Sequence, residues 1–190
     1  MRSFLTPFAL AILLTSPPAV AQSRTTPPAF AAMPGIAFRY YDVSGRTGQE
    51  VAASLRRNAL RRPDGQSASG LTRWGYSFRW GEYSDRHGCR IRDPRNDVSI
   101  TVTLPRLASA DRLAPRDRAW WDDYRRTIER HEAGHARIAL SHAGDFARAA
   151  EGARCGEIKT IAARVMERAG RLQADYDRVT RHGQAQEAVD

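Results

Sequence analysis

Residues 129–144 read ERHEAGHARIALSHAG and carry three of the five histidines of the chain. They belong to a segment, starting at Asp117, in which apolar and histidine side chains recur with a period of about 3.6 residues, so one long amphipathic helix is expected. Asp117 can cap its start and Gly152 can end it. A second helical pattern runs from about residue 155 to residue 179. Because the connection is short, the two helices should form an antiparallel hairpin.

His131 and His135 bracket Glu132 in the pattern H-E-x-x-H. Four residues apart on a helix, the two imidazoles point from the same face and can bind one zinc ion (Zn2+). Glu132 lies about 100° around the helix, where it can reach a zinc-activated water without displacing it. The alternative is a pair of core histidines bonded to backbone or carboxylate groups. The mid-helix position on the apolar face favours the metal site.

The third ligand is less directly indicated. His142 is on the same face, but seven residues past His135 it lies about 10.5 Å further along an unbroken helix, too far to share the ion. The intervening ARIALS contains no Gly or Pro to break the helix, so His142 should be a core residue or one that supports a ligand from outside the metal's own ligand set. The ligand should therefore come from the second helix or just beyond it. Spacing alone does not choose among four candidates: Glu167, Asp175, Asp177 and His182.

The N-terminal half has the alternation of strands. Thr47 can cap a short helix that contains Glu50 at its third residue. Four segments predict strands: 36–43, 71–83, 89–91 and 98–104. The predicted fold class is α+β, a small antiparallel sheet with one N-terminal helix, followed by a long antiparallel helical hairpin carrying HExxH.

Residues 1–21 have the features of a signal peptide: Arg2 at the start, a mostly apolar run over 4–14, and Ala19-Val20-Ala21 as a cleavage site. The apolar run is too short to span a bilayer, and no later segment is long and apolar enough to do so. Residues 22–34, rich in Pro, Thr and Ala, should be a flexible leader, and residues 35–190 one domain. The expected location is secreted or periplasmic.

Cys89 and Cys155 are the two cysteines of the chain. In an exported protein they predict one disulfide rather than a metal site, because neither has a second cysteine at C-x-x-C spacing. The net charge is +9, but the arginines are scattered, which argues against a nucleic-acid partner. The positive charge favours association with an anionic envelope.

Two blocks of motifs, in order along the chain, carry a resemblance. They are Thr72 and Trp74 in a T-x-W strand, Cys89-Arg90, Leu104-Pro105, Trp121 and Tyr124 ahead of HEAGH, Cys155, and the tail YDRVTRHGQAQ over 176–186. With them the chain resembles a bacterial family of predicted secreted zinc-dependent proteases, a domain of unknown function with the number nine-twenty-two. The shared tail places His182 first as third ligand, followed by Asp177. Gly183 would let the backbone fold His182 back toward the hairpin.

The expected function is that of a zinc metallohydrolase with a single zincin-like domain, acting on a peptide or protein substrate outside the cytoplasm. Glu132 would be the general base, and Tyr176 would donate to the developing oxyanion. The alternative is a non-catalytic envelope module in which zinc and the disulfide are structural. A fourth protein ligand would favour the module, and an open position beside Glu132 would favour the enzyme.

Overall fold

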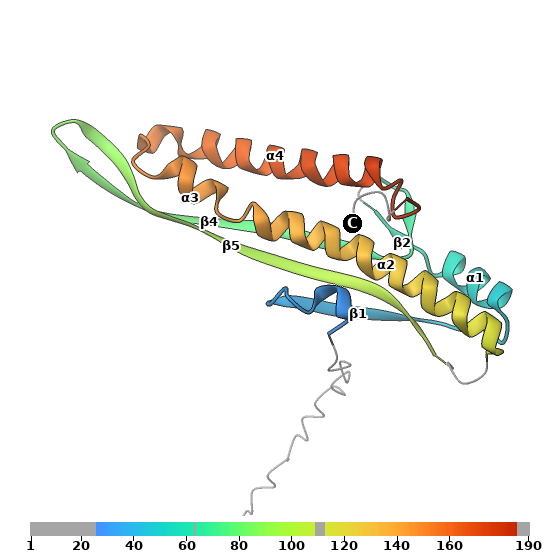
Figure 1. Cartoon of the computed structure of the whole chain (residues 1–190). Coiled ribbons are helices and arrows are strands. Elements are labelled where there is room, and N and C mark those ends of the chain that lie inside the picture. The colour runs from blue at the N-terminus through green and yellow to red at the C-terminus, as the bar shows by residue number, and fades with distance from the viewer. Residues whose placement is uncertain (1–25, 63, 109–112, 186–190) are drawn as a thin grey trace, which may run out of the picture.

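A computed structural model describes residues 26–62, 64–108 and 113–185, and Figure 1 shows the whole chain. The predicted signal peptide lies outside the described residues. Within the predicted leader, residues 28–30 form the short 3-10 helix η1, and Phe30 is fully buried. Its ring packs edge-on against Phe38, with the ring centroids 5.1 Å apart. This end of the leader is therefore part of the core, because burying a large aromatic side chain is favourable in free energy.

The main sheet has three strands in the order β1-β5-β4: β1 is Ile36–Val43, β4 is Leu71–Asp85 and β5 is Gly88–Leu107. Strands β4 and β5 form a long hairpin, and their pairing is antiparallel, as expected for the sheet. Strand β1 pairs in parallel with the second half of β5, from Ile36 opposite Ile100 to Val43 opposite Leu107. The fold class is α+β as predicted. The sheet is mixed and not antiparallel throughout, because β1 pairs in parallel with the edge of β5 that β4 leaves free.

Strand β5 runs through the interval where the sequence predicted a gap between two strands. The ladder shifts register between Arg79 and Gly81, opposite Asp93-Pro94. Asp93 has a left-handed backbone with a φ of +50°. A bulge accommodates this residue and the proline, which cannot donate to the ladder, without ending the strand.

Helix α1 is Gly48–Arg57, and its N-cap is Thr47, as predicted, with the hydroxyl accepting a bond from the Glu50 amide at 3.3 Å. A two-stranded hairpin follows, with β2 at Leu60–Arg61 and β3 at Ser67–Ala68.

Helix α2 is Pro115–Ser141 and is capped by Ala114 with Pro115 in the first turn, so the prediction of Asp117 as the cap was wrong. The prediction of one helix reaching Gly152 was also wrong: α2 ends at Ser141, and α3 is a separate helix, Asp145–Ala150. His142 Nδ1 bonds Asp145 Oδ2 at 2.9 Å across this break. Gly152, with a φ of +70°, follows α3.

Helix α4, Ile158–Val179, begins after the short 3-10 helix η3, Cys155–Glu157. Figure 1 shows α2 and α3 between the sheet and α4, which lies along them as the outer element. Three alanines of α2 (Ala133, Ala136 and Ala139) are buried against the sheet residues Ile100, Val102 and Leu104. Their small side chains let α2 approach the strands closely, and its opposite side then faces α4.

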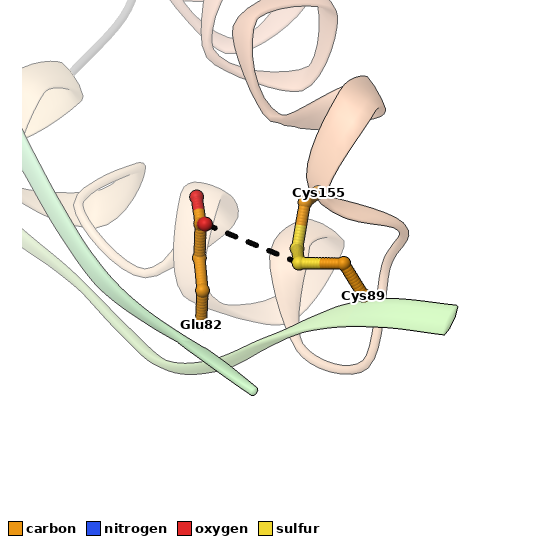
Figure 2. A group of neighbouring side chains, drawn as sticks. All are labelled: Glu82, Cys89 and Cys155. Atoms are coloured by element: carbon orange, nitrogen blue, oxygen red, sulfur yellow. Dashed lines mark hydrogen bonds between the residues drawn. A yellow bond between two sulfur atoms is a disulfide. The ribbon is translucent and has the colours of Figure 1, made fainter. Parts of the chain in front are cut away.

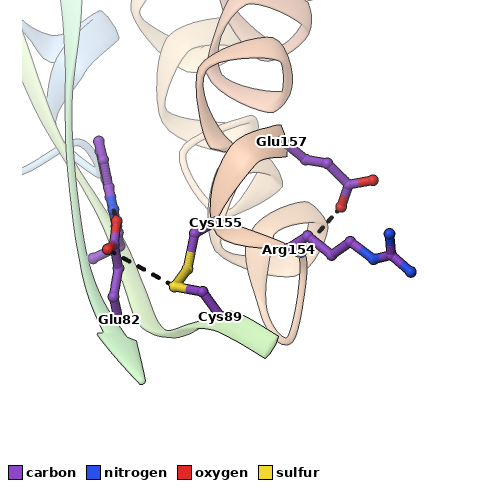
Figure 3. The surroundings of a disulfide bond; sticks show 6 residues. Glu82, Cys89, Arg154, Cys155 and Glu157 are labelled. Carbon is purple, nitrogen blue, oxygen red and sulfur yellow. Dashed lines mark hydrogen bonds between the residues drawn. A yellow bond between two sulfur atoms is a disulfide. The ribbon is translucent and has the colours of Figure 1, made fainter. Parts of the chain in front are cut away.

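The predicted disulfide is present and joins Cys89, at the start of β5, to Cys155 in η3, with the Cα atoms 5.5 Å apart. Glu82 lies beside it, and its carboxylate is 3.9 Å from Cys89 Sγ (Figure 2). These three residues could in principle hold a metal, but sulfur atoms bonded to each other do not supply thiolate ligands. On the other side Glu157 accepts a bond from the Arg154 amide at 3.0 Å (Figure 3). The bridge ties the β4–β5 hairpin to the start of α4.

Within the described residues, no helix is long and apolar enough to cross a membrane.

Candidate metal centre

Helix α2 holds the H-E-x-x-H residues on its side facing α4 and the start of β4. His131 and Glu132 are buried, and the side chain of His135 is 12% exposed. The two imidazole rings lie edge to face, with centroids 4.8 Å apart. The spacing of four residues therefore brings the two rings side by side, as the sequence predicted.

Asp177 of α4 completes a group of three. His131 Nε2 and His135 Nε2 each lie 3.2 Å from the same atom, Asp177 Oδ1. The three atoms all lie within 4.8 Å of one another. Two imidazole nitrogens from α2 and one carboxylate oxygen from α4 thus converge. His135 and Asp177 are 42 residues apart in the sequence.

This donor set fits a divalent metal ion. Two bonds of about 2.0–2.1 Å that meet at a tetrahedral angle place their donor atoms roughly 3.3–3.4 Å apart. The observed separations of 3.2 Å match that edge closely. Two histidines and one carboxylate are also a set that catalytic zinc sites use.

The outer nitrogens of both rings have partners that leave Nε2 available. His135 Nδ1 lies 2.5 Å from Gln173 Oε1, and Gln173 also donates to the His135 carbonyl at 3.0 Å. An amide oxygen can only accept, so Nδ1 carries a proton, and Nε2 is the nitrogen that would bind a metal. His131 Nδ1 lies 3.4 Å from Thr180 Oγ1, whose hydroxyl donates to the Tyr176 carbonyl at 2.8 Å. Both rings are therefore oriented as metal-binding imidazoles are, through bonds from their second nitrogen.

Asp177 is held on its other side by Arg62, which follows β2. Arg62 Nη2 lies 2.5 Å from Asp177 Oδ2, and both side chains are largely buried. Burial alone would raise the pKa of Asp177, but hydrogen bonds from His131, His135 and Arg62 outweigh it and hold the pKa well below its usual range. Asp177 is therefore a carboxylate, with Oδ2 occupied by arginine and Oδ1 facing the histidines.

Glu132 has a different environment. Its Oε2 accepts a bond from Thr72 Oγ1 at 2.7 Å, and Thr72 also donates to the Glu132 carbonyl at 3.1 Å. Burial raises the pKa of Glu132, and the nearby His135 and Thr72 offset only part of this effect. Among the described residues, no arginine or lysine forms an ion pair with it. By contrast Glu129, also buried in α2, is paired with Arg125.

Two glycines make this packing feasible. A Cβ atom on Gly70 would lie 2.7 Å from Glu132 Oε1, and one on Gly134 would lie 2.0 Å from the Tyr176 hydroxyl oxygen. The Tyr176 ring stacks on His131 at 5.2 Å and meets His135 edge-on at 5.0 Å. Tyr176, predicted as an oxyanion donor, is thus part of the centre, and in this structure it packs against both imidazoles.

His182, placed first as third ligand from the sequence, is close to the group but not in it. Its Nδ1 lies 3.3 Å from Asp177 Oδ1 and 2.8 Å from Arg62 Nη1, and its side chain is 44% exposed. Among the described residues, Asp177 and not His182 joins the two histidines in the group that could hold a metal.

The other candidate ligands lie elsewhere. Asp175 and Glu167 are exposed and paired with arginines of their own helix. His142 contacts Asp145 and not the metal group, as expected.

Sequence reasoning missed three residues of the centre: Arg62, Thr72 and Gln173. Thr72 was noticed only as part of a strand motif. Arg62 is 115 residues from Asp177, and no spacing rule connects a hairpin loop with the end of a distant helix.

Comparison with known proteins gives one match. No curated protein matches the chain, and no solved structure does. The profile of one family, described as "Bacterial protein of unknown function (DUF922)", matches residues 38–183. This range spans the sheet except for the first two residues of β1, both long helices and every residue of the metal group. The chain therefore belongs to the DUF922 family of bacterial proteins of unknown function.

Proposed function

We propose that the chain is a zinc-dependent hydrolase of peptide bonds, in which His131, His135 and Asp177 hold the metal and Glu132 is the general base. One observation carries the proposal: two imidazole nitrogens converge on one carboxylate oxygen next to a buried glutamate that pairs with no arginine or lysine of the described part of the chain. Buried carboxylates are normally paired with a cation. Within the described residues, the side chain of Glu132 has a hydroxyl as its hydrogen-bond partner and no arginine or lysine, and beside three potential metal ligands this is better explained by catalysis than by stability.

Zinc is the metal that the donor set favours, because borderline-soft imidazoles and a single carboxylate suit it better than Mg²⁺ or Ca²⁺, which prefer oxygen ligands. Bound there, zinc would lower the pKa of water toward neutrality and polarise the substrate carbonyl. Among the described residues no fourth histidine, cysteine or carboxylate joins the group. Three ligands leave one tetrahedral position for water, which favours the enzyme over the non-catalytic module.

Glu132 supplies the proton transfer. Its carboxylate accepts a proton from the attacking water and returns it to the leaving amine nitrogen as the peptide bond breaks. A raised pKa suits this exchange, because the group must hold the proton between the two steps. Thr72 fixes one carboxylate oxygen and leaves the other for the water.

The proposed location is outside the cytoplasm. The Cys89–Cys155 bridge is of a kind that persists in oxidising compartments. The substrate would accordingly be a peptide or protein of the envelope or the surroundings of the cell.

The test uses the chain without residues 1–21, here called the mature chain, loaded with zinc. Glu132→Gln should keep the zinc affinity but lose cleavage of a peptide library, because the amide cannot accept the proton. Glu129→Gln is the matched control: it alters a buried glutamate of the same helix that is paired with Arg125. It should leave cleavage intact if the protein remains folded. Equal turnover in wild type and Glu132→Gln would refute the mechanism.

A further inference from the structure

The turn after α4 holds His182 in an unusual backbone conformation. Arg181, His182 and Gly183 have consecutive positive φ angles of +48°, +55° and +87°. For the two non-glycine residues this left-handed conformation is energetically unfavourable. Two backbone bonds maintain the turn: the His182 amide donates to the Asp177 carbonyl and the Ala185 amide to the Thr180 carbonyl, each at 2.8 Å.

The same turn packs against a proposed ligand. A Cβ atom on Gly183 would lie 3.2 Å from His131 Cγ, so the backbone there touches the ring directly. Strained backbone that the surrounding structure enforces is concentrated at functional sites. The enforced conformation places the His182 imidazole beside Asp177.

The contact with Arg62 determines which nitrogen of His182 carries the proton. Arg62 Nη1 lies 2.8 Å from His182 Nδ1. A guanidinium group has donors only and stays charged, so Nδ1 must be the acceptor. In the neutral ring the proton is then on Nε2. With a metal bound to their Nε2 atoms, His131 and His135 would carry their protons on Nδ1, which is the opposite tautomer.

Two consequences follow for the role of His182. Its Nδ1 lone pair is already bonded to arginine, so Nδ1 is not available to a metal ion. The side chain that carries this Nε2–H is 44% exposed, whereas the side chain of His131 is 7% exposed. The His182 ring is also close to the proposed metal position, since its Nδ1 atom lies 3.3 Å from Asp177 Oδ1. An N–H donor that solvent and substrate can reach beside a metal is the group that oxyanion stabilisation requires.

We infer that His182 is the substrate-contacting hydrogen-bond donor of the metal centre, and that it stabilises the oxyanion formed when a peptide carbonyl is attacked. Arg62 is a positioning residue that fixes the His182 tautomer and the outer oxygen of Asp177. This inference rests on the proposed function, since the oxyanion arises only if the chain hydrolyses peptide bonds.

Long-range ¹H–¹⁵N spectra of the histidine rings in the zinc-loaded mature chain test the tautomer without any activity. His182 should be protonated at Nε2, and His131 and His135 at Nδ1. A His182 ring protonated at Nδ1, or one that shows the shifts of a metal-bound nitrogen, overturns the inference whether or not the chain cleaves peptides.

Variants test the catalytic part. His182→Ala should lower kcat about 10²–10³-fold, the typical effect of losing one oxyanion donor. Its zinc affinity should fall less than about tenfold, the lower limit for losing a residue that supports a ligand. A peptide phosphonate, a tetrahedral anion that mimics the intermediate, should bind more weakly by a factor similar to the loss in kcat. His182→Gln, which keeps an N–H donor, should recover part of both losses. His142→Ala is the control, since that histidine contacts Asp145 away from the centre.

The outcomes separate the two proposals. If His182→Ala loses zinc about 100-fold or more, the residue is a ligand and the inference is wrong. If kcat and phosphonate affinity are unchanged in His182→Ala, the residue is a bystander and the inference is again wrong, while the hydrolase stands. If the wild-type chain binds zinc but neither cleaves peptides nor binds the phosphonate, the proposed function fails, and the catalytic role of His182 fails with it.

Discussion

Gly134→Ala is a sensitive probe of the contact between the two long helices. The added Cβ would lie 2.0 Å from the Tyr176 hydroxyl oxygen and 2.2 Å from Cζ, whereas carbon contacts are optimal at about 3.5–4.0 Å. The ring cannot retreat freely, because it packs on His131 and His135 with centroids 5.2 and 5.0 Å apart. Overpacking of this kind costs about 1–3 kcal/mol.

The matched control is Gly170→Ala in the interior of α4, where a Cβ would meet nothing within 4 Å. Replacing glycine by alanine in a helix stabilises it by about 0.8–1.0 kcal/mol, and this gain applies to both variants. The difference in unfolding free energy between them therefore isolates the clash, and should be about 1–3 kcal/mol. Urea unfolding of the metal-free mature chain, followed by circular dichroism, measures it.

Zinc affinity should fall in Gly134→Ala and not in Gly170→Ala, because only the first displaces a ring that both histidines contact. If the two variants were stabilised equally, the packing of Tyr176 on the histidines described above would be refuted.

Three further outcomes are expected. Arg62→Ala should weaken zinc binding about 10–100-fold by releasing the outer oxygen of Asp177, whereas Arg61→Ala, in the same hairpin but exposed, should not; competition with a chelator compares them. Cys155→Ser should lower the unfolding free energy by about 2–5 kcal/mol, and a reducing agent should lower the midpoint of thermal unfolding in wild type but not in this variant. Burial raises the pKa of Asp145, but the hydrogen bond from His142 and the neighbouring arginine outweigh it and lower the pKa. Asp145 therefore contributes stability above its unfolded pKa, near 4, that is lost as the pH falls through its lower folded value. Asp145→Asn should be less stable than wild type at pH 7 and approach it at pH 3, as measured by urea unfolding; a constant difference would contradict the pKa shift.

Much of the fold follows from local patterns. The alternation around Trp74 predicted β4, the apolar period through His131 predicted α2, and Thr47 marked the start of α1. These features depend on residues that are close together in the sequence, so local sequence patterns predict them. The parallel pairing of β1 with β5 depends on which edge of β5 is left unpaired by β4. Strand β5 is far from β1 in the sequence, so no local pattern predicts this pairing.

The same holds for the metal centre: local patterns predicted the residues of one helix but not the contact between distant segments. H-E-x-x-H predicted the positions of two candidate ligands and of the proposed base, because a single helix turn sets their geometry. The third ligand depended on the register between two helices, and an error of one turn, about 5.4 Å, exchanges one candidate for another. Asp177 and His182 are both at that level. The left-handed turn at 181–183 decides between them, since it turns His182 toward Arg62 and leaves Asp177 facing the histidines.

Anomalous diffraction at the zinc absorption edge, from crystals of the mature chain grown with zinc, tests the central claim most directly. The account predicts one strong peak per chain, within about 2.2 Å of His131 Nε2, His135 Nε2 and Asp177 Oδ1, with no contact to His182 and with one position open toward Glu132. A chain with no peak at this place, or a peak that has His182 as a ligand instead of Asp177, would contradict it.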